Sequence, residues 1–200
     1  MTTLFINIKE LIQVRDLSED KVYGKDMGIL PIINNAFMLI EDDTITNFGS
    51  MDNLDIRKAD KVVDLTGRLV LPTWCDSHTH LVYADSREDE FVDRIKGLSY
   101  HKIAEKGGGI LNSAKKLQHK IEDHLYKDAV TRIEEIIKSG TGALEIKSGY
   151  GLTLDSELKM LQVIKKVKEI FPIPIKATFL GAHAIPSKYK ENREEYIQST

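Results

Sequence analysis

Hydrophobic and polar residues alternate along the first third of the chain, which is the pattern of β-strands with one buried face. The alternating runs are residues 2–7, 11–14, 36–41, 44–48, 62–65 and 68–71. Asp42–Asp43 joins two of these runs and Thr66–Gly67 joins two others, so the pattern predicts two β-hairpins. The sequence therefore predicts a small β-rich segment over residues 1–67.

From residue 87 onward, apolar residues recur three or four positions apart, which is the spacing of helices that bury one face. Helices are expected at residues 87–103, 110–117, 122–139 and 155–171, with strands between them at 143–147 and 175–180. In the last helix, the predicted buried face carries Leu158, Leu161, Ile164, Val167 and Phe171. Strands that alternate with helices in this way form parallel βαβ units, so the predicted class is α/β.

Composition narrows the class of protein further. The chain has 200 residues, 42% of them hydrophobic and 30% charged, which is ordinary for a globular protein. A formal net charge of −3 gives no electrostatic reason to expect nucleic acid or an anionic membrane as a partner. No apolar run approaches the roughly 18 residues of a membrane helix, and residues 1–16 lack the layout of a secretory signal. With Cys75 as the only cysteine, no intrachain disulfide forms, and the sequence predicts a cytoplasmic protein.

Two histidines close the stretch that links the two patterns. Residues 70–80 read Val-Leu-Pro-Thr-Trp-Cys-Asp-Ser-His-Thr-His, an apolar run that becomes a strand and ends in His78 and His80. On one face of a strand these side chains lie about 6.6 Å apart, and both nitrogens reach one metal ion at roughly 2.0–2.1 Å. For the pair alone, hydrogen bonding to neighbours is the simpler interpretation, because a metal site needs further ligands and a cavity.

Three more candidate residues follow predicted strands. Tyr150 and His183 each come just after one of the later strands, and Arg87 comes shortly after His80. In a parallel α/β barrel, functional groups gather at the carboxyl ends of the strands. A guanidinium at this position, such as that of Arg87, can bind a substrate carboxylate in a bidentate manner. Singly, each residue also fits a structural role, such as packing for Tyr150 or solvation for Arg87. Their common placement favours a shared site.

The histidine stretch resembles the first metal-binding strand of the amidohydrolase superfamily, and the β-rich segment before it resembles the small β-sandwich of these enzymes. Three other stretches are similar to the imidazolonepropionase family. They are Gly-Gly-Gly-Ile-Leu at 107–111, Glu-Ile-Lys-Ser-Gly-Tyr-Gly-Leu at 145–152, and Thr-Phe-Leu-Gly-Ala-His-Ala at 178–184. The resemblance covers nearly the whole chain, with one local departure at Thr73, where the family usually has glycine.

This resemblance implies a fold and an activity. The implied fold is an incomplete (β/α)8 TIM-type barrel over residues 68–200, preceded by part of a composite β-sandwich over residues 1–67. The implied activity is the metal-dependent hydrolysis of the cyclic amide of 4-imidazolone-5-propanoate to N-formimino-L-glutamate, a step of histidine degradation. One Zn²⁺ or Fe ion per full-length subunit would supply hydroxide from water at neutral pH.

The resemblance also implies roles for single residues. His78 and His80 would ligate the metal ion, and Arg87, Tyr150 and His183 would contact the substrate. Arg87 would bind the propionate group. His183 would hydrogen-bond the ring near the attacked carbon, which makes it the candidate catalytic residue.

The chain is short for a whole enzyme of this kind, because a complete barrel takes about 250 residues. The remaining metal ligands and the general base would lie beyond residue 200, so the isolated chain is expected to be inactive. It is also expected to be poorly stable, since its third barrel strand leaves an open edge. The alternatives are another amidohydrolase, either a cyclic-amide hydrolase or a purine or pyrimidine deaminase, and a non-catalytic half-barrel module. The expected partners are a small-molecule substrate and, at full length, a second copy in a homodimer.

Overall fold

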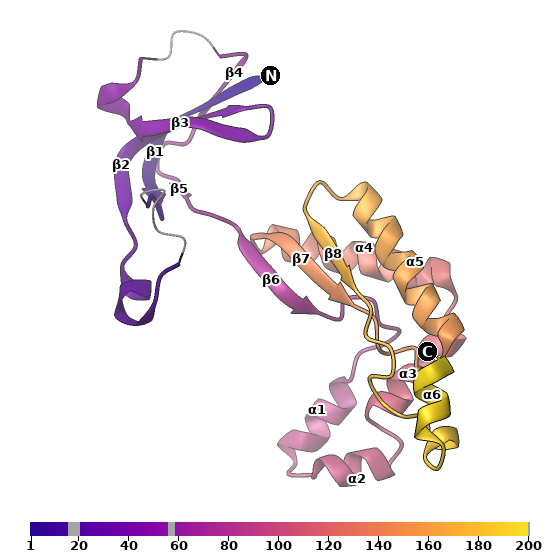
Figure 1. Cartoon of the computed structure of the whole chain (residues 1–200). Helices are drawn as coiled ribbons and strands as arrows, with labels where there is room; N and C mark the ends of the chain where they lie inside the picture. The colour runs from indigo at the N-terminus through magenta and orange to yellow at the C-terminus, as the bar shows by residue number, and fades with distance from the viewer. Residues whose placement is uncertain (16–20, 56–58, 200) are drawn as a thin grey trace. The chain divides into compact units, whose positions relative to one another are not determined.

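The structure is a computed structural model that describes residues 1–15, 21–55 and 59–199. The chain divides into two compact units, Met1–Pro72 and Thr73–Thr200 (Figure 1). Each unit has its own β-sheet.

The first unit is a five-stranded sheet in the order β3-β2-β1-β4, with β5 also paired to β1. Its strands are β1 (Thr2–Ile12), β2 (Ile32–Glu41), β3 (Thr44–Ser50), β4 (Lys61–Asp64) and β5 (Leu69–Val70). Two short 3-10 turns, η1 (Gly24–Gly28) and η2 (Met51–Asn53), lie between strands. The antiparallel pairing of β2 with β3 confirms the hairpin predicted at Asp42–Asp43. Ile8, Leu11 and Ala36 form the buried centre of this unit.

The second predicted hairpin is wrong. Both β4 and β5 pair with β1 in parallel, one after the other, and do not pair with each other. The backbone N–H of Leu65 donates to the carbonyl of Ile6 at 2.9 Å, and that of Lys9 donates to the carbonyl of Arg68 at 2.9 Å. Since both sides of the Thr66–Gly67 turn stay bonded to β1, the chain continues along β1 after the turn and does not reverse.

The second unit holds a parallel sheet in the order β6-β7-β8, as the βαβ pattern predicts. The strands are β6 (Trp74–Thr79), β7 (Thr141–Lys147) and β8 (Ile175–Thr178). The helices α4 (Glu122–Lys138) and α5 (Leu154–Ile170) pack against each other and against the sheet (Figure 1). Buried apolar side chains of both helices form one core with Leu144 and Ile146 of β7.

Shorter helices occupy the connections after β6 and β8. These are α1 (Glu88–Ile95), α2 (Tyr100–Glu105), α3 (Ile110–His119), the 3-10 turn η3 (Ser187–Tyr189) and α6 (Arg193–Ser199). The single helix predicted at 87–103 is wrong, because it divides into α1 and α2. Gly97 takes a φ of +85°, a left-handed conformation that ends α1, and Ser99 caps the start of α2.

The predicted buried face of α5 is also shifted. Leu158 is 47% exposed, whereas its neighbour Glu157 is 1% exposed. Ile164 and Val167 are buried as expected. The apolar period therefore locates the helix correctly, but the observed buried face includes a carboxylate and leaves out Leu158.

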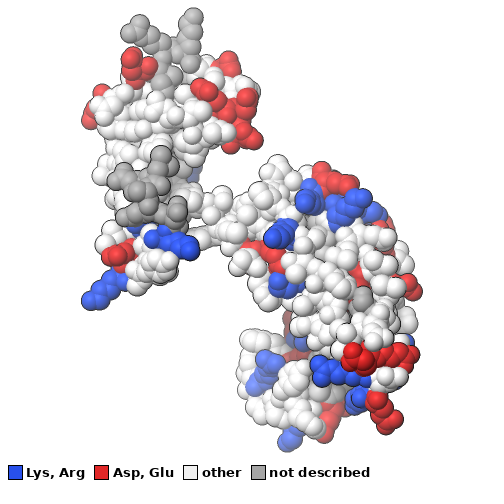
Figure 2. Space-filling model, in the orientation of Figure 1, with Lys and Arg blue, Asp and Glu red and all other residues white. Residues whose placement is uncertain are grey.

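Charged side chains of both signs are interspersed on the visible face of the second unit (Figure 2). Among the residues that the structure describes, no helix has the length and apolar character needed to span a membrane.

Candidate active site

Three of the five predicted site residues lie around the ring of a fourth, His80. The His80 and Tyr150 rings stack with centroids 4.6 Å apart and an interplanar angle of 18°. The His78 ring lies 5.5 Å from that of His80, and the His183 ring lies 6.0 Å from it. The guanidinium carbon of Arg87, the fifth residue, lies 5.8 Å from the centre of the Tyr150 ring. These residues come from β6 and from the segments that follow β6, β7 and β8, so the carboxyl ends of the three strands bring them together.

His80 has the environment of a neutral imidazole. Its Nδ1 atom is buried and has no hydrogen-bond partner among the described residues. Burial lowers the pKa of His80 below its usual range, and the neighbouring His183 and His78 lower this pKa further. A neutral imidazole with an unpaired nitrogen is the form of histidine that binds a metal ion.

His78 is held differently. It lies within β6, and its backbone N–H donates to Asp76 Oδ1 at 3.2 Å. Its side chain is exposed, unlike the buried nitrogen of His80. Within the described ranges, no group of three or more His, Cys, Asp or Glu side chains is placed to hold a metal ion. The donor set therefore fits two ligands of a site that needs further ones.

Arg87 is fixed at one edge of its guanidinium and unpaired at the other. Its Nε donates to Ser113 Oγ at 2.8 Å, and its Nη1 lies 4.0 Å from a carboxylate oxygen of Glu90. The Nη2 atom is buried and has no hydrogen-bond partner in the part of the chain that the structure describes. A buried, unpaired guanidinium nitrogen is costly unless a ligand uses it.

Glu90 links Arg87 to the three-glycine segment. Its Oε1 accepts a hydrogen bond from the backbone N–H of Gly109 at 2.8 Å, at the start of α3. Gly109 has a φ of +81°, and a Cβ on Gly108 would lie 2.9 Å from a side-chain carbon of Ile103. These glycines therefore allow a close turn that brings Glu90, and with it Arg87, to the start of α3.

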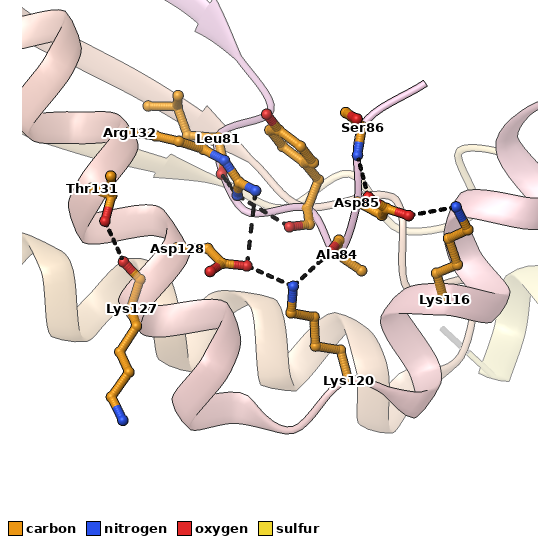
Figure 3. A network of polar contacts seen from close by, with 11 residues as sticks. Leu81, Ala84, Asp85, Ser86, Lys116, Lys120, Lys127, Asp128, Thr131 and Arg132 are labelled. Carbon is orange, nitrogen blue, oxygen red and sulfur yellow. Dashed lines mark hydrogen bonds and ion pairs between the residues drawn. The ribbon is translucent and has the colours of Figure 1, made fainter. Parts of the chain in front are cut away.

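Arg132 and Lys120 hold the segment between His80 and Arg87 (Figure 3). Arg132 Nη1 donates to the carbonyls of Leu81 and Tyr83 at 3.0 and 3.1 Å, and its guanidinium carbon lies 3.4 Å from the centre of the Tyr83 ring. Lys120 Nζ donates to the carbonyl of Ala84 at 2.6 Å.

Asp128 completes this network on α4. One of its carboxylate oxygens lies 2.6 Å from Lys120 Nζ and 3.9 Å from Arg132 Nη2 (Figure 3). Neither Arg132 nor Lys120 follows from the apolar pattern, which marks both only as polar residues. The sequence signal that accompanies them is the pairing of Asp128 with Arg132 four residues later on one helix face.

Glu157 holds the segment that carries Tyr150. Its Oε2 accepts from the backbone N–H of Gly149 at 2.7 Å, and its Oε1 accepts from those of Gly151 and Leu152 at 2.7 and 3.0 Å. The pattern of apolar residues does not single out Glu157. Its available signal is Thr153, which caps α5 by accepting from a backbone N–H and so marks Glu157 as a first-turn carboxylate.

Solved structures share the fold of this chain. Guanine deaminase from E. coli aligns with a TM-score of 0.61 and 12% identity, over 99% of this chain and 42% of that one. An uncharacterized metal-dependent hydrolase from Pyrococcus furiosus aligns with a TM-score of 0.51 and 12% identity, over 90% of this chain and 50% of that one. At these identities the likeness concerns the fold alone. The chain has an α/β fold with partial sheets, similar to part of the TIM-barrel amidohydrolases.

Sequence relatives identify the family more narrowly, although no family model matches the chain. Imidazolonepropionase from Flavobacterium psychrophilum is 64% identical over 98% of this chain, and the one from Flavobacterium johnsoniae is 60% identical over the same share. The Fusobacterium nucleatum imidazolonepropionase is 41% identical over 96%. The chain spans about half the length of these curated relatives, 46–48%. It corresponds to the N-terminal half of imidazolonepropionases, which confirms the family resemblance of its motifs.

Proposed function

We propose that this chain supplies the N-terminal half of a metal-dependent imidazolonepropionase. The reaction is the hydrolysis of the cyclic amide of 4-imidazolone-5-propanoate to N-formimino-L-glutamate. The observation that carries the proposal is the cluster of His78, His80, Tyr150 and His183 with Arg87 beside it. The 64% identity to a curated imidazolonepropionase supports the choice of substrate.

Arg87 is the proposed anchor for the propionate group. Its Nη2 has no partner among the described residues, while Ser113 fixes Nε and Glu90 lies near Nη1. A substrate carboxylate that bonds to Nη2 would satisfy this buried donor and gain a charge-assisted hydrogen bond. The carboxylate would then lie close to the Tyr150 ring, beside which the guanidinium rests.

His78 and His80 are the proposed metal ligands, with zinc or iron as the ion. The unpaired, buried Nδ1 of His80 and the lowered pKa of this residue fit a ligating imidazole. When bound, a divalent ion of this kind polarises a carbonyl and strengthens water as a nucleophile at neutral pH. The remaining ligands are proposed to come from outside these 200 residues.

Tyr150 and His183 are the proposed contacts for the imidazolone ring. Tyr150 stacks on His80, so its ring forms a flat wall beside the proposed ligand. His183 lies 6.1 Å from Tyr150 between ring centroids and is exposed. We assign to His183 a hydrogen bond to the substrate ring near the attacked carbon, which orients the carbonyl for attack.

The finer features of the fold belong to the same proposal. Residues 1–67 would form part of a composite β-sandwich, and residues 68–200 would form the first part of a (β/α)8 barrel. The three-stranded parallel sheet and its two covering helices support this assignment. The isolated chain would then be inactive, and the full-length protein would act in the cytoplasm on a small molecule, as a homodimer.

The test uses two proteins. One is the chain alone, and the other, here named the completed chain, joins residues 1–200 to the remaining C-terminal part of the Flavobacterium psychrophilum relative. We expect the completed chain to convert 4-imidazolone-5-propanoate to N-formimino-L-glutamate, and the chain alone to have no activity. Preference for dihydroorotate or guanine would favour another amidohydrolase. A completed chain that folds but converts none of the three would favour the non-catalytic module.

Variants of the completed chain test the separate roles. Arg87→Ala should lower kcat/KM for imidazolonepropionate on the order of 100-fold, since it removes a charged partner of the substrate. Arg94→Ala is the matched control, because Arg94 is exposed with its guanidinium carbon 5.9 Å from the centre of the Tyr100 ring, and this change should leave kcat/KM unchanged. Metal analysis should find about one equivalent of zinc or iron per chain, lost in His78→Ala. Full metal content in His78→Ala would refute the ligand assignment.

A further inference from the structure

Glu157 is a buried carboxylate that the proposed reaction does not use. It lies in the first turn of α5 and is 1% exposed. Within the described ranges, no cation forms an ion pair with it. Its partners are instead three backbone N–H groups, those of Gly149, Gly151 and Leu152. Successive N–H groups of this kind, close to a helix N-terminus, form a natural site for a negative charge.

The three donors lie on both sides of Tyr150 in the sequence. One carboxylate oxygen is bonded before Tyr150, at Gly149, and the other is bonded after it, at Gly151 and Leu152. The backbone of Tyr150 is therefore fixed at both ends by a single side chain. Because the Tyr150 ring stacks on His80, this fixes the distance between the ring and the proposed ligand.

The surrounding packing leaves this loop little freedom. A Cβ on Gly151 would lie 2.6 Å from the backbone nitrogen of Glu157, and a Cβ on Gly149 would lie 3.0 Å from the carbonyl oxygen of Leu180. Ser148 Oγ accepts from the backbone N–H of Leu180 at 3.1 Å, which links the loop to the segment that leads to His183. A substitution at Glu157 is therefore expected to shift the loop that carries Tyr150.

We propose that Glu157 is a positioning residue, which sets the place of Tyr150 beside His80 and Arg87 by binding the backbone on both sides of Tyr150. This inference rests on the proposed function only in that Tyr150 contacts the substrate. The bonds from Glu157 to the loop are independent of any reaction.

The first test measures kinetics in the completed chain. Glu157→Gln replaces one oxygen with an NH₂ group that faces a backbone N–H, so the loop must shift. We expect KM to rise about tenfold with kcat changed less than about threefold, because substrate binding by Tyr150 suffers first. Glu169→Gln makes the same chemical change at an exposed position of α5 and should alter neither constant.

A double-mutant cycle separates positioning from general destabilisation. In a Tyr150→Ala background, Glu157→Gln should cause no further rise in KM, since the side chain it positions is gone. An equal rise in both backgrounds would overturn the inference. Ile164→Val, a buried change on α5 away from the loop, should lower the unfolding midpoint without altering KM.

Gly149→Ala provides a second route if Glu157→Gln does not fold. Gly149 has a φ of +109°, so the added methyl group strains the loop and presses on Leu180 while Glu157 stays unchanged. We expect the same rise in KM as for Glu157→Gln. An unchanged KM in Gly149→Ala would contradict the claim that the loop position sets substrate binding.

Hydrogen exchange gives a readout that does not depend on activity. At least one of the amides of Gly149, Gly151 and Leu152 should exchange at least about tenfold faster in Glu157→Gln than in Glu169→Gln, because glutamine keeps only one of the two acceptor oxygens. Unchanged exchange at all three amides would overturn the inference even if the completed chain is active. If the amides respond but the completed chain is inactive, the proposed function fails and the positioning of Tyr150 by Glu157 stands.

Discussion

The loops after β6 and β7 are held in place by side chains of opposite charge. The loop after β6 turns its carbonyl groups toward α4, and the cations Arg132 and Lys120 donate to them. The loop after β7 turns its N–H groups toward the start of α5, and the carboxylate of Glu157 accepts from them. In each case, a covering helix supplies or supports the charge that pairs with the backbone groups of the loop.

The two arrangements differ in burial, and burial determines how strongly each stabilises its loop. The side chains of Arg132 and Lys120 are 19% and 27% exposed, while Glu157 is 1% exposed. Water can replace part of what the cations supply, but it reaches the three N–H groups around Glu157 less easily. The loop that carries Tyr150 should therefore be more sensitive to loss of its charge than the loop that leads to Arg87.

The largest expected effect on stability is that of Glu157→Ala. This change leaves three buried N–H groups without an acceptor and should lower the free energy of unfolding of the completed chain by about 3 kcal/mol. Urea unfolding followed by circular dichroism measures the loss. Glu169→Ala, at an exposed position of the same helix, should change the free energy by less than about 0.5 kcal/mol. If Glu157→Ala and Glu169→Ala lower the free energy of unfolding equally, burial does not determine how strongly these carboxylates stabilise the protein.

Arg132→Met should have the next largest effect, a loss of about 2 kcal/mol. It removes two hydrogen bonds to backbone carbonyls and the stacking on Tyr83, while methionine keeps most of the apolar contact. Arg132→Lys keeps the charge but not the planar fork, so it should lose about half as much. If Arg132→Met proves more harmful than Glu157→Ala, the cations and not the carboxylate are the stronger restraint.

The sequence predicted the parallel strands and the two long helices of the second unit, and the residues at its strand ends, but not the division of 87–103 into two helices. The apolar period is visible in short stretches of sequence, so it predicts single strands and helices. Parallel strands then bring their carboxyl ends together at one edge of the sheet. His78, His80, Tyr150 and His183 could therefore be named in advance. The resemblance to a family added their roles, which remain predictions.

The sequence did not predict Glu157, Arg132 or the course of the chain through Thr66–Gly67. Position 157 lies on the same helix face as Ile164 and Val167, but the sequence shows no partner for a carboxylate there. Its partners are backbone N–H groups, whose orientation depends on the loop conformation. The residues of the Thr66–Gly67 turn are typical of a hairpin, but they do not show whether the two flanking strands pair with each other or with a third strand. In this protein that strand is β1, which pairs with both β4 and β5.

Lys120→Met tests whether the cation network acts through backbone contacts or through its ion pair. Lys120 donates to the carbonyl of Ala84 and pairs with Asp128, both at 2.6 Å. We expect a loss of about 1 kcal/mol, since the group is partly exposed. Lys115→Met, at an exposed position of α3, is the control and should have no measurable effect. If Asp128→Asn is as harmful as Lys120→Met, the ion pair outweighs the contact with the loop.

The smallest expected effect is the pH dependence from Asp85, which ties the same loop to α3. A hydrogen bond from Lys116 at 2.6 Å, together with its charge, holds the pKa of Asp85 below its usual value of 3.8 (Figure 3). A carboxyl group with a depressed folded-state pKa stabilises the fold above pH 3.8, and this contribution is lost as the pH falls through the folded-state pKa. Since the side chain is 57% exposed and screened by salt, the contribution should stay below about 1 kcal/mol. Urea titrations at low salt should show that Asp85→Asn is less stable than the wild type at pH 6 and that the gap narrows at pH 3. A gap that persists at pH 3 would mean that the charge of Asp85 is not the source of its contribution to stability.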